Sequence, residues 1–164
     1  MQVRLFPSSP DDREGMLAIF NHYVEHTFAT YTETPVSLER FNDLMVFSPG
    51  WPAVTARDDD GAVLGFGLLR PYSTIPTFSR TAELTCFIAP GFTGMGIGAA
   101  ILGELEARAR DFGIGTIVAT VSSLNDGSIR FHAAHGFAEC GRLRGIGARQ
   151  GFAFDVVFMQ KTLQ

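Results

Sequence analysis

Hydrophobic and polar positions along the chain predict a series of strands. Several segments show either the alternation of a half-buried strand or the short apolar run of a buried one. Two of these segments flank Asp58-Asp59-Asp60-Gly61, and Asp-Gly favours the positive φ values of a hairpin turn. The expected strands are residues 2–6, 51–57, 62–69, 81–88, 115–121, about 137–143, and 152–162.

Apolar residues recur at helical spacing between these strands. The sequence Ser9-Pro10-Asp11-Asp12 is typical of a helix start, and further helices are expected over 38–47, over 99–112, and from Asn125 to Gly136. The threonine-rich residues 27–34 are interpreted as a loop or a broken helix. This order of elements predicts an α/β or α+β fold with one sheet flanked by helices. The length of 164 residues predicts one domain, spanning 1–164.

Composition limits the class of protein and its partners. An apolar fraction of 46% excludes a disordered chain. A net charge of −4 gives no global basic surplus, so we expect neither nucleic acid nor an anionic membrane as a partner. Two cysteines form no disulfide framework, and neither a signal peptide nor a membrane-spanning apolar run is found in the sequence. We therefore expect a reduced, cytoplasmic protein.

The strongest local signal is a glycine loop between an expected strand and an expected helix. Residues 90–98, P-G-F-T-G-M-G-I-G, lead directly into the helix. Glycine lets the backbone approach a ligand closely, and a helix N-terminus offers free N–H groups to an anion. No lysine or arginine lies in the loop, so backbone amides would have to bind a phosphate or pyrophosphate there.

Three interpretations of this loop remain open from the residues alone. A P-loop is excluded, because the pattern lacks the Gly-Lys-Ser/Thr ending. The dinucleotide pattern is formally met by Gly94, Gly96 and Ala99, yet residues 113–124 lack the acidic residue that it requires. A tight turn without a ligand and a site for another pyrophosphate compound are the other two interpretations. The dinucleotide interpretation would make the protein an oxidoreductase.

Five stretches in the right order resemble the Gcn5-related N-acetyltransferases, and among them the phosphinothricin acetyltransferase branch. The resemblance implies a mixed, mostly antiparallel, splayed sheet of the acyl-CoA N-acyltransferase type. It also implies acetyl-CoA as co-substrate, a small-molecule amine as acceptor, no metal, and a homodimer. The stretches are N-H-Y-V-E at 21–25, T-A-E-L-T at 81–85, the loop at 90–98, L-N-D-G-S-I-R-F-H at 124–132, and D-V-V-F-M-Q at 155–160.

The resemblance also assigns residues to acetyl-CoA. Backbone amides of the loop would hold the pyrophosphate, the main chain of the preceding strand would hold the pantetheine arm, and Asn125 would cap a helix and bind a pantetheine amide. Thr93 stands where the family has Gln or Arg, which motivates an alternative function as an acetyl-CoA-binding sensor without catalysis. The predicted coenzyme contacts are Cys86, Phe87, Ile88, Gly94, Met95, Gly96, Ile97, Gly98, Ala99 and Asn125.

Catalytic and substrate residues follow from the same resemblance. Glu83, the only charged residue of its strand, is the predicted general base. His132 stands where a neutral imidazole could bond to the leaving sulfur or an imidazolium could protonate it. Tyr31 and Arg80 are predicted to line the pocket of an amino acid or analogue resembling phosphinothricin or methionine sulfoximine. Arg149 could serve an anionic group of the substrate, but it is interpreted as a solvated surface residue.

Overall fold

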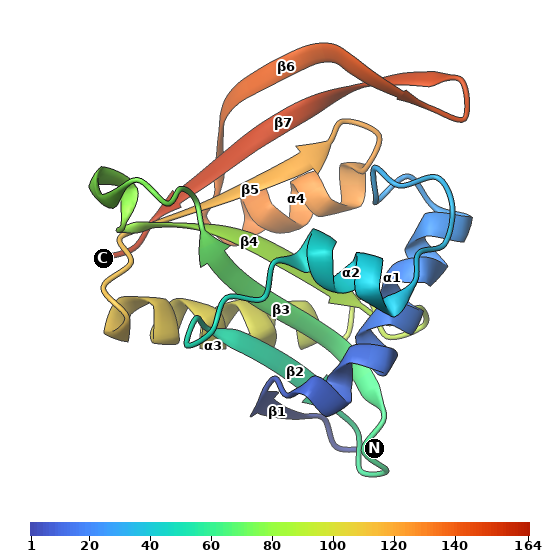
Figure 1. The fold of residues 1–164 in the computed structure, drawn as a ribbon, viewed down its shortest axis with the longest axis vertical. Helices are drawn as coiled ribbons and strands as arrows, with labels where there is room; N and C mark the ends of the chain where they lie inside the picture. Colours follow the sequence, from blue (N-terminus) through green and yellow to red (C-terminus); the bar gives the residue numbers. More distant parts are fainter.

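One seven-stranded sheet runs through the molecule, with helices on both of its faces (Figure 1). The computed structural model describes residues 1–164. The strands follow the spatial order β1-β2-β3-β4-β5-β7-β6. They are β1 (Arg4–Pro7), β2 (Ala53–Arg57), β3 (Val63–Pro71), β4 (Thr81–Ile88), β5 (Thr116–Ser122), β6 (Ala138–Arg149) and β7 (Phe152–Thr162).

The helices lie where the hydrophobic pattern predicts them, with small shifts at their ends. A short 3-10 turn, η1 (Pro10–Asp12), precedes α1, and a second, η2 (Pro76–Phe78), lies between β3 and β4. Residues 27–36 between the first two helices contain no helix or strand, as expected. The helices are α1 (Arg13–His26), α2 (Leu38–Met45), α3 (Ile97–Asp111) and α4 (Asp126–Ala134).

The sheet splits between its two central strands. All neighbouring strands pair antiparallel except β4 and β5, which run parallel and pair only over Thr81–Glu83 and Thr116–Val118. Beyond these positions β4 stays with β3 and β5 stays with β7, so the two strands diverge toward their carboxyl ends (Figure 1). This arrangement confirms the predicted splayed sheet. A doubly wound parallel sheet, which the dinucleotide interpretation requires, is absent.

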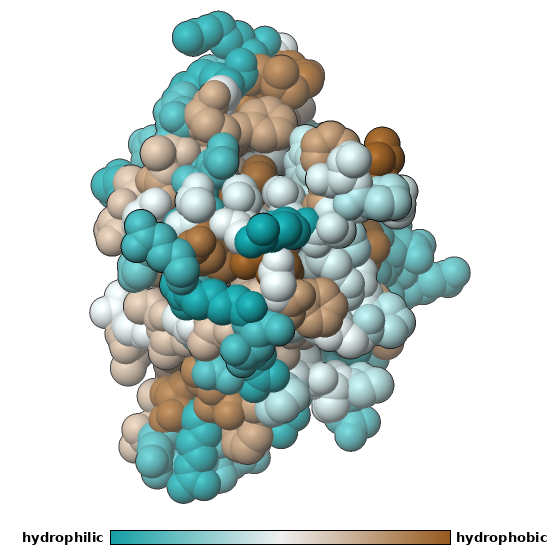
Figure 2. All heavy atoms as spheres, turned by 90° about the vertical axis from the view of Figure 1, so that its left-hand side faces the viewer, coloured by the Kyte–Doolittle hydropathy of each residue, from teal (hydrophilic) through white to brown (hydrophobic).

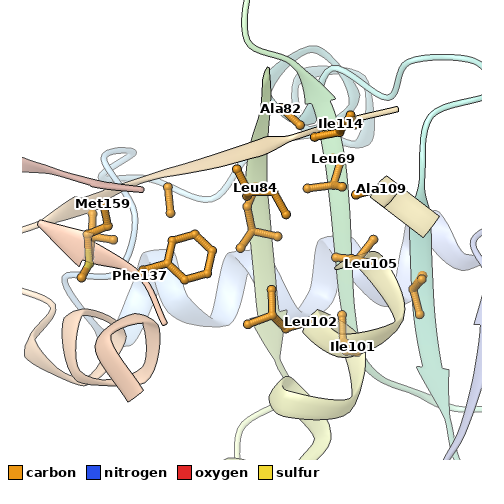
Figure 3. Close-up of a cluster of buried hydrophobic side chains, with 14 of the residues drawn as sticks. Leu69, Ala82, Leu84, Ile101, Leu102, Leu105, Ala109, Ile114, Phe137 and Met159 are labelled. Atoms are coloured by element: carbon orange, nitrogen blue, oxygen red, sulfur yellow. The ribbon is translucent and has the colours of Figure 1, made fainter. Parts of the chain in front are cut away.

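The face of the sheet that packs on α3 carries the larger of two apolar clusters. Ile101, Leu102 and Leu105 of α3 are buried against Leu69 of β3 and Leu84 of β4 (Figure 3). Phe137 and Met159 extend this cluster under the second half of the sheet. The cluster therefore spans both sides of the split and holds the two half-sheets together beneath it.

A second apolar cluster fills the opposite face, under α1 and α2. Met16 and Phe20 of α1 and Phe41 of α2 are buried against Phe66 and Leu68 of β3. Alternation along β3 explains the division, since side chains two residues apart point to the same face of a sheet. The same alternation directs Arg70 of β3 to the side of α1 and α2.

The last hairpin is longer than the hydrophobic pattern predicts. β6 continues to Arg149 rather than ending near residue 143. Its last eight residues, R-L-R-G-I-G-A-R, form an edge strand in which only Arg149 is buried, so no apolar alternation marks it. Register shifts against β7 at Glu139/Gly141 and Leu143/Gly147 break the pattern further. The prediction of a short strand was wrong for this reason.

The surface shows no continuous apolar belt on the face that carries the C-terminus and the β3–β4 connection. Figure 2 shows hydrophobic side chains there in separate groups, divided by hydrophilic ones. None of the helices combines the length and the apolar character that crossing a bilayer requires.

Candidate active site

A cavity of about 230 Å³ opens where β4 and β5 separate. Strands β4 and β5 form two of its walls, α4 contributes a third, and the α1–α2 loop together with the end of α2 covers it. The lining residues are Phe20, Ala29, Thr30, Tyr31, Thr32, Leu44, Met45, Arg70, Leu84, Thr85, Cys86, Phe87, Ala119, Thr120, Val121, Ser122, Asn125, Ser128 and His132.

Glu83 lies at the apex of the split, because it is the last residue of β4 that pairs with β5. Its partner across the β3–β4 ladder is Arg70, whose Nε lies 3.3 Å from Glu83 Oε2. The Nη1 of Arg70 donates to Thr85 Oγ1 at 3.3 Å and to the carbonyl of Met45 at 3.2 Å. The carboxylate is therefore oriented from one side by a guanidinium that is itself held by a second residue of β4 and by the end of α2.

Tyr31 reaches from the α1–α2 loop to the same apex. Burial raises the pKa of its phenol, the negative charge of Glu83 raises it further, and a side-chain hydrogen bond with Thr120 opposes both effects. The ring stacks on Phe154 of β7 with centroids 5.6 Å apart. Glu83 itself does not line the cavity, whereas its ion-pair partner Arg70 and its neighbour Tyr31 do. A proton would thus reach Glu83 past these groups or through one water.

His132 and Asn125 form the wall that α4 contributes. The Asn125 side-chain oxygen accepts from the Ser128 N–H at 3.2 Å, which caps the helix as predicted. His132 is buried, and its Nδ1 lies 2.7 Å from the Ser128 carbonyl. Burial lowers the pKa of His132, the bond to that carbonyl raises it, and the neighbouring His135 lowers it. In the neutral ring Nδ1 carries the proton, and Nε2 is left as an acceptor.

The main chain of β4 offers its free groups at Cys86. The Ala89 N–H donates to the Leu64 carbonyl at 2.8 Å, and hydrogen-bonded positions alternate along an antiparallel ladder. The backbone groups of Phe87 therefore face β3, and those of Cys86 face the gap toward β5. The Ile88 carbonyl accepts from the Tyr23 hydroxyl at 2.6 Å. Of the three predicted strand positions, Cys86 therefore has both backbone groups open to a ligand, whereas the Ile88 carbonyl is occupied by Tyr23.

The glycine loop lies at the open end of the split, directly after β4. Gly94 has a φ of 75°, and Gly96, the N-cap residue just before α3, has a φ of 82°. Residues with side chains rarely adopt this region. The first N–H bonded within this turn is that of Ala100, which donates to the Gly96 carbonyl at 3.0 Å. The N–H groups from Thr93 to Ala99 have no acceptor in the chain. Such a row of free amides at a helix start is suited to an anion.

The structure gathers some of the sequence-predicted residues and separates others. Tyr31, His132 and Asn125 line the cavity, and Glu83 stands directly behind it. Met95 and the neighbouring loop positions lie outside the cavity at its open end, with the Met95 side chain exposed. Arg80 is exposed and lies over Gly115, outside the cavity lining. The arginine that the fold brings to the cavity is Arg70.

Sequence reasoning missed two features of this site. The pairing of Arg70 with Glu83 depends on the β3–β4 register, and the nine-residue segment 72–80 between the two strands carries no register signal. Arg149 was interpreted as a solvated residue, and this was wrong. It is 1% exposed and donates to the backbone of the α1–α2 loop. Its position in a glycine-rich edge strand gives no sign of burial in the sequence.

The arrangement can hold a long ligand with a charged end and a reactive end. Free amides at the open end fit a pyrophosphate, the exposed edge of β4 at Cys86 fits an extended amide-bearing arm, and a carboxylate stands at the apex. No cluster of three or more His, Cys, Asp or Glu side chains is arranged to hold a metal ion. The parts of acetyl-CoA match these features in the same order, so the residues present fit that compound.

Comparison with known proteins agrees with this geometry. Residues 16–137 match the model of the Acetyltransferase (GNAT) family. The chain is 34% identical over 155 residues to the L-methionine sulfoximine/L-methionine sulfone acetyltransferase of Pseudomonas aeruginosa, which covers 93% of this chain and 90% of that protein.

Two solved structures share the whole fold. A GNAT superfamily phosphinothricin acetyltransferase from Sinorhizobium meliloti, solved in complex with acetyl-CoA, has a TM-score of 0.87 and 30% identity, covering 99% of this chain and 89% of that one. The ribosomal-protein-alanine N-acetyltransferase from Brucella melitensis has a TM-score of 0.86 and 33% identity, covering 99% of this chain and 100% of that one.

Proposed function

The chain belongs to the acetyltransferase (GNAT) family and is an N-acetyltransferase, and we propose that it transfers the acetyl group of acetyl-CoA to the primary amine of a small amino acid or amino-acid analogue. The observation that carries this proposal is the split between β4 and β5, which has free loop amides at its open end and Glu83 at its apex. A small amine and a long coenzyme would enter this split from different sides and meet near the apex.

The chain's own backbone would hold the coenzyme. Free N–H groups from Thr93 to Ala99 would bind the pyrophosphate, and the main chain of Cys86 would pair with the pantetheine arm. Asn125, whose side-chain oxygen already caps α4, keeps its amide N–H groups for the same arm. Thr93 supplies no cationic side chain, so the backbone amides would carry the phosphate binding alone.

Glu83 would accept the proton that the substrate ammonium must lose. Amines of this kind are mostly protonated at neutral pH, and only the free amine has the lone pair needed for attack. Acetyl-CoA supplies an acetyl group on a thioester, whose C–S bond breaks as the C–N bond of the product amide forms. Glu83 does not line the cavity, whereas its partner Arg70 does, which supports passage of the proton to Glu83 through one water.

His132 would act as a neutral group beside the reacting atoms. Its Nδ1 is engaged by the Ser128 carbonyl and burial lowers its pKa, so an imidazolium acid is not favoured at neutral pH. The departing thiolate would take its proton from solvent or from the proton released by the amine. His132 Nε2 would then accept a hydrogen bond from the resulting thiol.

The size of the cavity and the named relatives support a small substrate. A volume of about 230 Å³ lies below the roughly 300–1,000 Å³ typical of drug-sized ligand sites. The Pseudomonas aeruginosa relative is named for methionine sulfoximine and methionine sulfone. We therefore expect an α-amino acid or a close analogue with a polar side chain.

A thermal-shift comparison followed by a thiol-release assay tests the proposal. Acetyl-CoA is expected to raise Tm by mass action, and NADH is expected to leave Tm unchanged. The amine panel contains methionine sulfoximine, phosphinothricin, a polyamine and a peptide with an N-terminal alanine. Release with an amino-acid analogue supports the proposal. No Tm rise overturns it, a rise without turnover on any amine favours a sensor, and turnover on the peptide alone assigns a protein N-terminus instead.

A further inference from the structure

Arg149, the last residue of β6, is a buried arginine without a carboxylate partner. It is 1% exposed, and its Nη1 donates to the Thr30 carbonyl at 2.7 Å and to Thr30 Oγ1 at 3.1 Å. Its Nη2 donates to the Val24 carbonyl. The remaining donor, Nε, has no acceptor in the chain. A buried guanidinium held only by neutral oxygens is uncommon, because burying a charge without a counter-charge is costly.

The end of α1 partly offsets this charge. Val24 belongs to the last turn of α1 (Arg13–His26), where backbone carbonyls have no partner within the helix and carry the negative end of the helix dipole. Thr30 follows in the α1–α2 loop, and its hydroxyl donates onward to the Thr32 carbonyl at 3.1 Å. A single side chain from the far hairpin therefore joins the end of α1 to the loop that covers the cavity.

The rest of the hairpin tip supports the same loop. The Gln150 N–H donates to Glu33 Oε1 at 2.9 Å, Phe152 packs edge-on against Phe28, and Phe154 stacks on Tyr31. Figure 1 shows the tip of the β6–β7 hairpin and the α1–α2 loop at the same end of the molecule. Residues 27–36 have no regular secondary structure. Two hydrogen bonds between Asn21 and Val36 hold the far end of the loop, and the hairpin contacts hold the part that covers the cavity.

We propose that Arg149 is a positioning residue for the amine substrate: by fixing Thr30 it holds the α1–α2 loop over the split, so that Tyr31 stands at the apex beside Glu83. This inference rests on the proposed function for its catalytic consequence. Arg149 itself does not line the cavity, whereas Ala29, Thr30, Tyr31 and Thr32 do. Its effect must therefore pass through the loop.

The position of the loop predicts a selective effect on the two substrates. The loop covers the part of the split near the apex, where the amine is expected. The glycine loop lies beyond the other end of β4. The side-chain contacts of Arg149 are all with the end of α1 or the α1–α2 loop, at Val24, Phe28 and Thr30. Loosening the loop should weaken amine use and leave acetyl-CoA binding intact.

The test compares Arg149→Met with Arg149→Lys and a matched control, Arg142→Met, which removes another β6 arginine that pairs with Asp155 away from the loop. In Arg149→Met, hydrogen exchange at residues 29–33 is expected to quicken by about tenfold. The KM for the amine is expected to rise by about tenfold while the KM for acetyl-CoA changes by less than about twofold. The lysine variant is expected to fall between wild type and Arg149→Met, and the control to match wild type.

Hydrogen exchange separates this inference from the proposed function, because it can be measured whether or not any amine is turned over. Unchanged exchange at 29–33 overturns the positioning role. Faster exchange with an unchanged amine KM, or an equal rise in both KM values, also overturns it. Should Arg149→Met fail to fold, Arg149→Lys and Thr30→Val, which removes the hydroxyl acceptor, decide by the same measurements.

Discussion

Arg70 and Glu83 face each other across the β3–β4 ladder, with Arg70 Nε 3.3 Å from Glu83 Oε2. The same guanidinium also binds Thr85 Oγ1 and the Met45 carbonyl at the end of α2. The two side chains are about three-quarters buried, so salt screens the attraction between their charges less than in a surface ion pair. Two strands and a helix thus determine where the carboxylate points. Its uncommitted oxygen, Oε1, is the atom available to a proton.

Replacing Glu83 by Gln should remove the base while keeping its shape. We expect kcat to fall by about tenfold or more, since a positioned general base contributes about 10²–10⁴-fold. The KM for acetyl-CoA should stay unchanged, because the glycine loop is remote from the apex. Thiol release at saturating amine measures the effect. Glu104→Gln, which removes a carboxylate paired with Arg108 on α3, is the matched control. Unchanged kcat in the Glu83 variant would exclude the residue as the base.

Replacing Gly96 by Ala should weaken coenzyme binding through the backbone. The φ of 82° is strained for alanine, although its Cβ would meet no atom within 4 Å. Gly61, with a φ of 86° and equally open space, lies in the β2–β3 turn and gives a control of the same strain. Each substitution should cost about 1 kcal/mol or more of unfolding free energy.

Acetyl-CoA affinity separates these two glycine variants. Gly96→Ala should raise the Kd, measured by calorimetry, by about tenfold because the free amides lose their common direction. Gly61→Ala should leave the Kd unchanged. Equal Kd values in the two variants would contradict a coenzyme role for the loop backbone.

Local patterns predicted the fold well because each element carries its own signal. The β4 strand has the predicted ends, Thr81 and Ile88, and Asn125 caps α4 as its side chain and spacing indicate. The glycine loop could be found in the sequence for the same reason, since the positive φ values at Gly94 and Gly96 favour glycine at these positions.

Long-range relationships were not predictable in this way. Arg149 is 119 residues from Thr30 in the chain, and only the path of the β6–β7 hairpin brings them together. Arg70 lines the cavity and Arg80 does not, and this difference likewise follows from strand register and not from residue type. Such pairings depend on how whole elements pack, and a single sequence carries no local trace of that packing.

The two cysteines should differ sharply toward alkylating agents. Burial raises the pKa of Cys86 to about 12, so the reactive thiolate is a fraction of about 10⁻⁴ at pH 8. Cys140 is exposed on β6. With iodoacetamide, mass spectrometry should find Cys140 labelled in the native protein and Cys86 labelled only after unfolding. Rapid native labelling of Cys86 would contradict the buried, protonated thiol and would favour Cys86 as a nucleophile, a role that direct transfer does not need.

His132 should make stability fall as the solution becomes mildly acidic. Burial, the first cause, lowers its pKa in the folded protein below the ordinary 6.5. Between 6.5 and that lowered value the unfolded chain binds a proton that the folded chain does not, so the free energy of unfolding decreases as pH falls through this window. Above 6.5 both states hold a neutral ring, and the histidine's contribution is constant.

The comparison with His132→Gln isolates this effect, because every other titrating group is common to the two proteins. Urea unfolding at about pH 7.5 and about pH 5.5 measures both free energies. The wild-type protein should lose more stability between these values than the variant does. An equal loss would mean that His132 takes up a proton in the fold as easily as in the unfolded chain. The ring would then be available as an imidazolium, and it would serve as an acid toward the leaving thiolate rather than as the neutral acceptor proposed for Nε2.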